Sequence, residues 1–161
     1  MRQIVLGVGE IGVCDGTESI KTFALGSCVA LILVDKHTGI VGMAHIALPE
    51  SNINLKKAEE LPGYFADTGI EALLASMADK GAPVERSRSE IKLVGGAQIM
   101  DTEGTFNIGK RNVLAIKKLL WAKGMAPIAE DVGGNISRTV TAHGGSGRVH
   151  INTHDIPEKI I

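Results

Sequence analysis

The chain has 161 residues and a net charge of −1, and aromatic residues make up only 3% of it. This length suits one domain that can bury a core, which aliphatic residues and methionine must then supply. The near-neutral charge argues against a protein that binds nucleic acid irrespective of sequence, because such proteins present a basic surface.

The N-terminal residues and the apolar runs bear on where the protein resides. Residues 1–6 lead directly into glycine and then Glu10, which predicts no secretory signal. No apolar run approaches the roughly 20 residues that cross a bilayer. Two cysteines, Cys14 and Cys28, in a chain without a signal favour reduced thiols. We therefore expect a cytoplasmic protein with no membrane insertion.

Strands dominate the predicted first half of the chain, and helices alternate with strands in the second half. Apolar and β-branched runs predict strands over residues 3–6, 19–25, 29–34 and 40–46. The polar, charged stretch 49–63 is expected to be an exposed loop. Helical periodicity follows over 65–80 and 109–123, the second with Asn107 as a candidate N-cap. Further strands are predicted over 91–94, 128–132 and 148–152.

Residues 29–46 are predicted to form a β-hairpin, because the sequence between the two apolar runs, Asp-Lys-His-Thr-Gly, has turn chemistry. With that turn, Cys28 falls opposite Ala47 and His45 falls opposite Ala30. Cys28 and His45 then lie on one face of the hairpin as diagonal neighbours, with Cβ atoms somewhat under ~7–8 Å apart. A slip of one residue in the register would put them on opposite faces.

Cys28 and His45 have the residue types of a cysteine nucleophile and its base. Taken alone, Cys28 is more commonly a small buried apolar residue, and His45 a core histidine bonded to a carbonyl. Their shared face favours catalysis, since an imidazole beside a thiol can take its proton. Thr22 on the preceding strand could orient the imidazole, although threonine in a strand is ordinary. Gly26 and Ser27 could bring donors to an oxyanion, or they are simply turn residues.

The remaining motifs give weaker predictions. The segment 7–12 matches the dinucleotide pattern G-x-G-x-x-G, but a β-like stretch follows it where the motif must open a helix, so this interpretation is set aside. His143, His150 and His154 are scattered, and Cys14 and Cys28 lack the spacing of metal ligands. We expect no metal, no cofactor and a structural role for Cys14.

Several segments of the chain resemble the CheD proteins of bacterial and archaeal chemotaxis. The similarity covers about residues 3–152 in the family's order, and the combination is more specific than any one motif. The segments that carry it are TFALGSCVA (22–30), GMAHIALP (42–49), YFADT (64–68), GGA (95–97), NIGKRN (107–112) and EDVGGN (130–135). The chain departs from the family's pattern in a charged insert over 54–61 and in the tail after Asn152.

The resemblance implies an α+β fold of packed β-sheets flanked by helices, an α-β-β-α sandwich like the catalytic domain of cytotoxic necrotizing factor toxins. It implies a single CheD-like deamidase domain over residues 1–152, with 153–161 as a C-terminal tail. The implied enzyme is a protein-glutamine glutaminase, which deamidates glutamines in the cytoplasmic helices of methyl-accepting chemoreceptors to glutamate, with some hydrolysis of receptor methyl esters.

The family's Cys–His–Thr triad would fall here on Cys28, His45 and Thr22, with the thiolate forming a thioester intermediate. The resemblance also implies a protein partner, a CheC-like chemotaxis phosphatase. The alternative hypothesis is therefore a non-enzymatic binding protein that regulates such a phosphatase, with the candidate site partly reused as the docking face.

Overall fold

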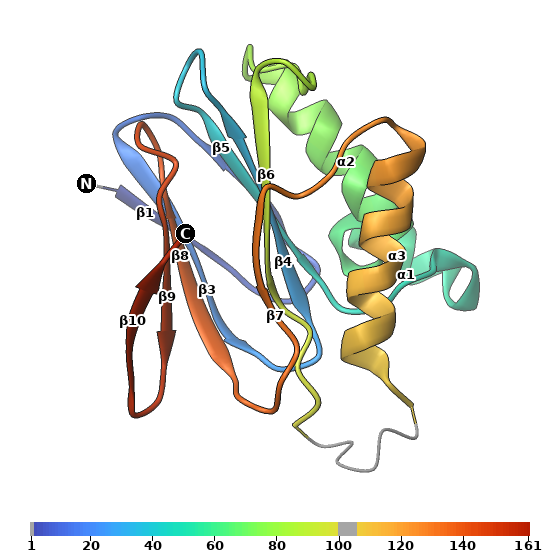
Figure 1. The fold of residues 1–161 in the computed structure, drawn as a ribbon. Coiled ribbons are helices and arrows are strands. Elements are labelled where there is room, and N and C mark those ends of the chain that lie inside the picture. The colour runs from blue at the N-terminus through green and yellow to red at the C-terminus, as the bar shows by residue number, and fades with distance from the viewer. Residues whose placement is uncertain (1, 100–105) are drawn as a thin grey trace.

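The computed structural model describes residues 2–99 and 106–161. Within these residues two five-stranded sheets lie face to face, and the helices lie beside one of them (Figure 1). The first sheet has the strand order β1 (Arg2–Leu6), β3 (Glu18–Leu25), β8 (Arg138–His143), β9 (Val149–Thr153) and β10 (Ile156–Ile160). The second has the order β2 (Ile11–Cys14), β5 (Val41–Ile46), β4 (Val29–Asp35), β6 (Ser89–Gly95) and β7 (Ala129–Val132). The helices are α1 (Leu55–Glu60), α2 (Ala66–Asp79) and α3 (Ile108–Ala122), with 3₁₀ turns η1 (Ser51–Ile53) and η2 (Pro62–Tyr64).

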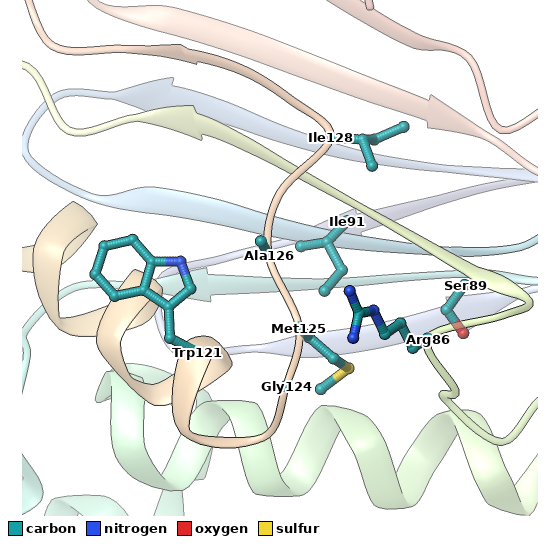
Figure 2. Close-up of a pocket in the computed structure, with 8 residues that line it drawn as sticks. All are labelled: Arg86, Ser89, Ile91, Trp121, Gly124, Met125, Ala126 and Ile128. Atoms are coloured by element: carbon teal, nitrogen blue, oxygen red, sulfur yellow. The ribbon is translucent and has the colours of Figure 1, made fainter.

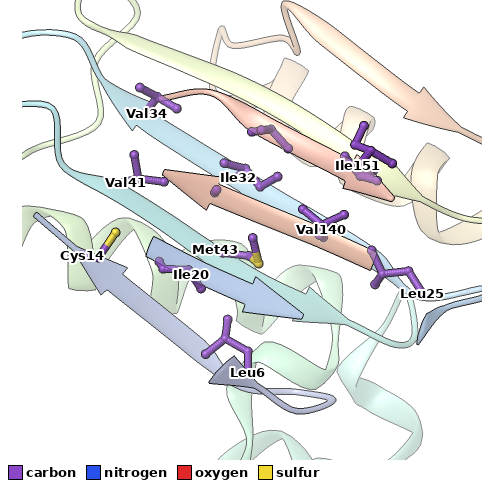
Figure 3. Packing of buried hydrophobic residues seen from close by; sticks show 14 residues of the cluster. Leu6, Cys14, Ile20, Leu25, Ile32, Val34, Val41, Met43, Val140 and Ile151 are labelled. Atoms are coloured by element: carbon purple, nitrogen blue, oxygen red, sulfur yellow. The ribbon is translucent and has the colours of Figure 1, made fainter. Parts of the chain in front are cut away.

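Strand β4 is buried along its whole length because it lies in the middle of the second sheet and is packed on both faces. Ala30, Ile32 and Val34 belong to the apolar cluster between the two sheets (Figure 3). Leu31 and Leu33 belong to the cluster on the opposite face, which includes buried residues of α2 and α3. A strand covered on both faces has the continuous apolar sequence that β4 shows.

The expected α+β sandwich of packed sheets flanked by helices is confirmed. The helices that the structure describes lie on the side of the β2-β5-β4-β6-β7 sheet, whereas the outer face of the β1-β3-β8-β9-β10 sheet carries none in the same residues (Figure 1). Strands β3, β8, β9 and β10 pair antiparallel, and antiparallel sheets commonly have one face in contact with water.

The predicted register of the β4–β5 hairpin is confirmed. Ala30 pairs with His45, and the Asp35 N–H donates to Ile40 O at 2.8 Å, which closes the hairpin at its turn. Both faces of this hairpin are buried, so a slip of one residue would exchange the side chains between two different cores.

Other segments differ from the sequence predictions. Strands β2, β8 and β10 were not among the predicted strands, and β10 lies within the expected tail 153–161. The prediction of a loop over 49–63 is wrong, because α1 forms there between two 3₁₀ turns, and Asn54 caps it by accepting from Lys57 N–H at 3.0 Å. Asn107 does occupy the N-cap position of α3, but it has φ of 51° and its side chain does not form the expected cap in the described structure.

A buried ion pair holds the turn of the hairpin. The Asp35 carboxylate is fully buried and accepts from Arg88 Nε at 2.6 Å and Nη2 at 2.7 Å, and from Thr38 N–H at 3.0 Å. The Arg88 guanidinium and the Thr38 donors hold the pKa of Asp35 well below its ordinary range. This pair joins the β4–β5 turn to the segment before β6.

We expect Asp35→Asn to lower the free energy of unfolding by about 3 kcal/mol, because it leaves the Arg88 guanidinium without its counter-ion in a largely buried setting. Urea denaturation at neutral pH measures the loss. Since the folded pKa of Asp35 is depressed, its contribution is complete above the ordinary carboxyl pKa and is lost as the pH falls toward the folded value. The variant should therefore lose less stability than the parent in acid. Equal urea midpoints for the two proteins would contradict the expected role.

Candidate active site

The turn that carries Cys28 lies at the end of the sandwich, where β3 gives way to β4. The segment that follows β6 supports its backbone. Ala97 N–H donates to Gly26 O at 2.8 Å, and Gly96 N–H donates to Cys28 O at 2.9 Å. Gly95 lies so close that a Cβ there would be 2.3 Å from Cys28 O, and its φ of 118° also favours glycine. Gly95, the last residue of β6, is therefore required by the cysteine turn.

Cys28 is a free, partly buried cysteine that lines a cavity of about 540 Å³. Gly26 and Ser27 line the same cavity, as do the apolar side chains of Ile99 and Phe106, which are both exposed to solvent. Burial raises the pKa of the Cys28 thiol. Burial therefore favours the neutral thiol form of Cys28.

His45 is held in one tautomer by Thr22. Thr22 Oγ1 lies 2.6 Å from His45 Nδ1 and donates to Leu6 O at 2.9 Å, and both side chains are buried. A hydroxyl has one proton to donate. Because that proton goes to Leu6 O, the hydroxyl must accept from His45, so the imidazole carries its proton on Nδ1 and a lone pair on Nε2.

The lone pair on His45 Nε2 is not engaged by any described residue. Nε2 is buried and has no hydrogen-bond partner among the described residues. Burial lowers the pKa of His45, which keeps the ring neutral. Thr22 in the first sheet and His45 in the second are thus in direct contact.

Cys28 and His45 share the face of the second sheet that points toward the first sheet. The last β4–β5 pair is Val29–Ile46, so Cys28 and Ala47 lie one position beyond the ladder, whereas His45 pairs with Ala30 inside it. The unpartnered Nε2 means that the described structure contains no hydrogen bond from the Cys28 thiol to it. Hydrogen bonds between catalytic groups are often long before substrate binds and tighten in the complex.

Asn112 on α3 also contacts this region, and sequence reasoning did not identify it as a site residue. Its side chain is fully buried, and Nδ2 donates to Ser27 O at 3.0 Å and to Ala47 O at 2.9 Å. The signal in the sequence is its position, since Asn112 falls on the apolar face of the predicted helix with Ile116 and Leu120. Asparagine is mostly exposed in folded proteins, so a buried asparagine on the apolar face of a helix is unusual.

The G-x-G-x-x-G segment, 7–12, runs into β2 and opens no helix, so it lacks the structural context of a dinucleotide motif. Its backbone instead borders the candidate base. Gly9 N–H donates to His45 O at 2.8 Å, and His45 N–H donates to Glu10 O at 3.1 Å. Through these two hydrogen bonds, the segment holds both the N–H and the C=O of His45 in β5.

Outside this site, the described residues contain a further cavity and a second free cysteine. A second cavity of about 430 Å³ lies where α3 ends, and its lining contains no cysteine or histidine (Figure 2). The residues lining it are Arg86, Ser89, Ile91, Trp121, Gly124, Met125, Ala126 and Ile128. Over residues 2–99 and 106–161, no group of three or more His, Cys, Asp or Glu side chains is arranged to hold a metal ion. Cys14 is buried in the core between the sheets, and its thiol pKa is raised to about 11, mainly by burial.

The fold and the site together define a class of protein: a two-sheet sandwich in which a cysteine, a histidine and a threonine gather at one end. None of the helices in the described residues is long and apolar enough to cross a membrane. The family model described as "CheD chemotactic sensory transduction" matches residues 47–153.

Known proteins match this chain over nearly its full length. A protein of Syntrophotalea carbinolica is 48% identical over 153 residues, which is 94% of each chain, and is named "Probable chemoreceptor glutamine deamidase CheD". A protein of Solibacter usitatus with the same name is 40% identical, over 100% of this chain and 95% of its own. The "Chemoreceptor glutamine deamidase CheD" of Thermotoga maritima is 40% identical over 145 residues, 90% of this chain and 88% of its own. The chain belongs to the CheD family.

Proposed function

We propose that this protein is a chemoreceptor glutamine deamidase, a protein-glutamine glutaminase that uses Cys28 as its nucleophile. Membership of the CheD family and the names of its relatives support the activity. The observation that carries the mechanism is the pairing of Thr22 with His45. It leaves a lone pair on Nε2, and that nitrogen lies on the sheet face that also bears the cavity-lining thiol.

The reaction begins when a receptor glutamine side chain enters the cavity beside Cys28. Nε2 of His45 takes the thiol proton while the sulfur attacks the carboxamide carbon, which gives a tetrahedral intermediate. Backbone N–H groups at Ser27 and Cys28 stabilise its oxyanion, a contribution worth about 2.7–4 kcal/mol per donor. The imidazolium then gives its proton to the departing nitrogen, so ammonia leaves and a thioester remains.

Water completes the reaction through the same histidine. Nε2 of His45 removes a proton from a water molecule, and the resulting hydroxide attacks the thioester carbonyl. The sulfur leaves and recovers the proton from the imidazolium, which restores the thiol and releases glutamate. Thr22 keeps the Nδ1–H tautomer throughout, because its hydroxyl remains committed to Leu6 O.

We expect the pH profile of deamidation to have its acid limb below pH 6.5. Burial holds the pKa of His45 below that ordinary value, so the ring stays neutral, and therefore basic, as the pH falls to 6.5. The raised pKa of Cys28 means that no thiolate accumulates near neutrality without this base. Measurement of kcat/KM against pH on a receptor fragment tests the expectation. An acid limb centred at or above pH 6.5 would contradict it.

We expect Thr22→Val to lower kcat by about 10- to 100-fold, because the variant lacks the hydroxyl that accepts from Nδ1–H and fixes the tautomer. Thr22→Ser keeps the hydroxyl and is the matched control, for which kcat should stay near that of the parent. Steady-state kinetics on a receptor fragment give both values. Equal losses in the valine and serine variants would show that the hydroxyl has no positioning role.

Binding of a CheC-like phosphatase is the second function that the family resemblance suggests. Phe106 is 67% exposed and Ile99 is 37% exposed, and both line the cavity that contains Cys28. Apolar side chains exposed at a cavity suit a protein partner as well as a substrate. Receptor and phosphatase would then compete for one surface, and receptor cytoplasmic helices would place the reaction in the cytoplasm.

The proposed activity is tested by incubating a receptor cytoplasmic fragment with the protein and following each glutamine by peptide mass spectrometry. Conversion of particular glutamines to glutamate, at a rate proportional to protein concentration, supports a deamidase. A receptor fragment that keeps every glutamine, while still binding the protein, would instead favour the binding hypothesis.

A further inference from the structure

The side-chain amide of Asn112 joins two strands at the point where their own pairing ends. The β4–β5 ladder stops at Val29 and Ile46. Beyond it, Ala47 turns away from β4, since its N–H donates to Tyr64 O at 2.9 Å. Asn112 Nδ2 spans the opening, with Ser27 O at 3.0 Å on one side and Ala47 O at 2.9 Å on the other.

The two carbonyls that Asn112 binds flank the candidate nucleophile. Ser27 directly precedes Cys28, and Ala47 follows His45 by two residues, one position beyond the last pair of the β4–β5 ladder. A change in the spacing of these two carbonyls therefore changes the spacing of the thiol and the imidazole. The contact reaches from a helix into the sheet, so it is independent of the hydrogen bonds within the hairpin.

The hydrogen bonding of Asn112 is not what the stability of the fold alone would favour. Its Oδ1 is buried without a hydrogen-bond partner in the described chain, which is an unfavourable state for an acceptor. An apolar residue on this face of α3, like Ile116 and Leu120, would avoid that cost. Both hydrogens of Nδ2 are used, so the residue is retained for its donors and not for its acceptor. Buried groups left unsatisfied in native structures often have a functional reason.

We infer that Asn112 is a positioning residue whose amide clamps the Cys28 turn to the end of β5 and so sets the distance between Cys28 Sγ and His45 Nε2. The inference goes beyond the proposed function in one respect: the coupling of the two side chains exists whether or not the substrate is a receptor glutamine. Only its effect on turnover depends on the proposed reaction.

A double-mutant cycle on thiol reactivity tests the clamp without any receptor. Iodoacetamide is the probe, and mass spectrometry of the Cys28 peptide gives the alkylation rate at pH 7. We expect His45→Asn to slow alkylation by about tenfold or more in the parent protein, because the base is lost. In the Asn112→Leu background the same change should have almost no effect, because the spacing of the thiol and the imidazole is no longer fixed.

Two further variants separate positioning from stability. Ile116→Val removes a methylene from the same face of α3, one turn away, and should keep the full dependence of alkylation on His45. Asn112→Ala is the second clamp variant, used where Asn112→Leu does not fold, and the same loss of dependence is expected of it. On a receptor fragment, the clamp variants should lose kcat with KM little changed.

Each result of the cycle either supports or overturns the positioning role of Asn112. If His45→Asn slows alkylation of Cys28 by the same factor with and without Asn112, the inference is overturned. It is also overturned if His45→Asn leaves the alkylation rate of the parent protein unchanged. An equal loss of coupling in Ile116→Val would also overturn it, by showing that destabilisation alone is sufficient. If the cycle behaves as expected but the parent protein converts no receptor glutamine, the clamp stands and the proposed function fails.

Discussion

Replacement of Cys28 by alanine should abolish the conversion of receptor glutamines, with a loss in kcat of about 10⁴-fold or more. A carboxamide is a poor electrophile, and without the sulfur the site has no nucleophile that can form the covalent intermediate. The side chain is only partly buried at the edge of the core, so the fold should survive the change. Peptide mass spectrometry of a receptor fragment measures the rate, and circular dichroism checks the fold.

Cys14→Ala is the matched control for this experiment. Cys14 is the other free cysteine, but it is fully buried, its Sγ donates weakly to Glu18 O at 3.7 Å, and it does not line the cavity of Cys28. This variant should lose some stability and keep its activity. If the Cys28→Ala protein retained a tenth of the parent rate, the covalent mechanism would be contradicted. If that variant also bound a CheC-like phosphatase normally and supported chemotaxis, the binding hypothesis would be favoured.

Replacement of His45 by asparagine should lower kcat by about 10²- to 10⁴-fold, the usual contribution of a positioned general base. The asparagine amide can still donate to Thr22 Oγ1 in place of Nδ1–H, so the contact between the sheets is preserved. What the variant lacks is the Nε2 lone pair that the parent leaves unpartnered in the described structure. Steady-state kinetics from neutral to alkaline pH measure the effect.

The pH dependence of the His45→Asn variant separates a base from a structural histidine. With the base absent, activity should rise with pH as the thiolate forms without assistance, so the deficit should shrink in alkali. A purely structural histidine would give a deficit that is constant with pH and matches a loss of folded protein. That constant deficit is the result that would contradict general-base catalysis by His45.

The sequence allowed the hairpin to be predicted correctly because local chemistry determines it. Turn residues follow the apolar run of β4, and burial of both faces leaves only one acceptable register. That register determines which face of the second sheet His45 occupies. Helices α2 and α3 were also predictable, since each has an apolar face with helical periodicity.

The missed elements carry weak local signals. In β8 only Val140 and Ala142 are apolar residues that point into the core, and a six-residue strand with two such positions resembles a loop in sequence. Every residue of β10 is exposed, and Pro157 lies within it, so neither burial nor composition marks it as a strand. Helix α1 has six residues, which is too short for periodicity to be recognised.

The site depends on contacts that sequence reasoning could only partly anticipate. Thr22 and His45 belong to different sheets, so their contact, and the tautomer that it fixes, follow from how the sheets pack. The role of Asn112 depends on α3 lying across the end of β4 and β5, many residues away in the chain. The directions of the pKa shifts at Cys28 and His45 likewise arise from burial in the assembled fold.

The nucleophilic role of Cys28 is tested most directly by alkylating the parent protein with iodoacetamide and then measuring conversion of a receptor fragment by peptide mass spectrometry. Untreated protein should convert specific glutamines to glutamate, and conversion should fall in proportion to the fraction of Cys28 modified, with Cys14 unmodified. Undiminished conversion by protein whose Cys28 is fully alkylated would contradict a thiol nucleophile at this position.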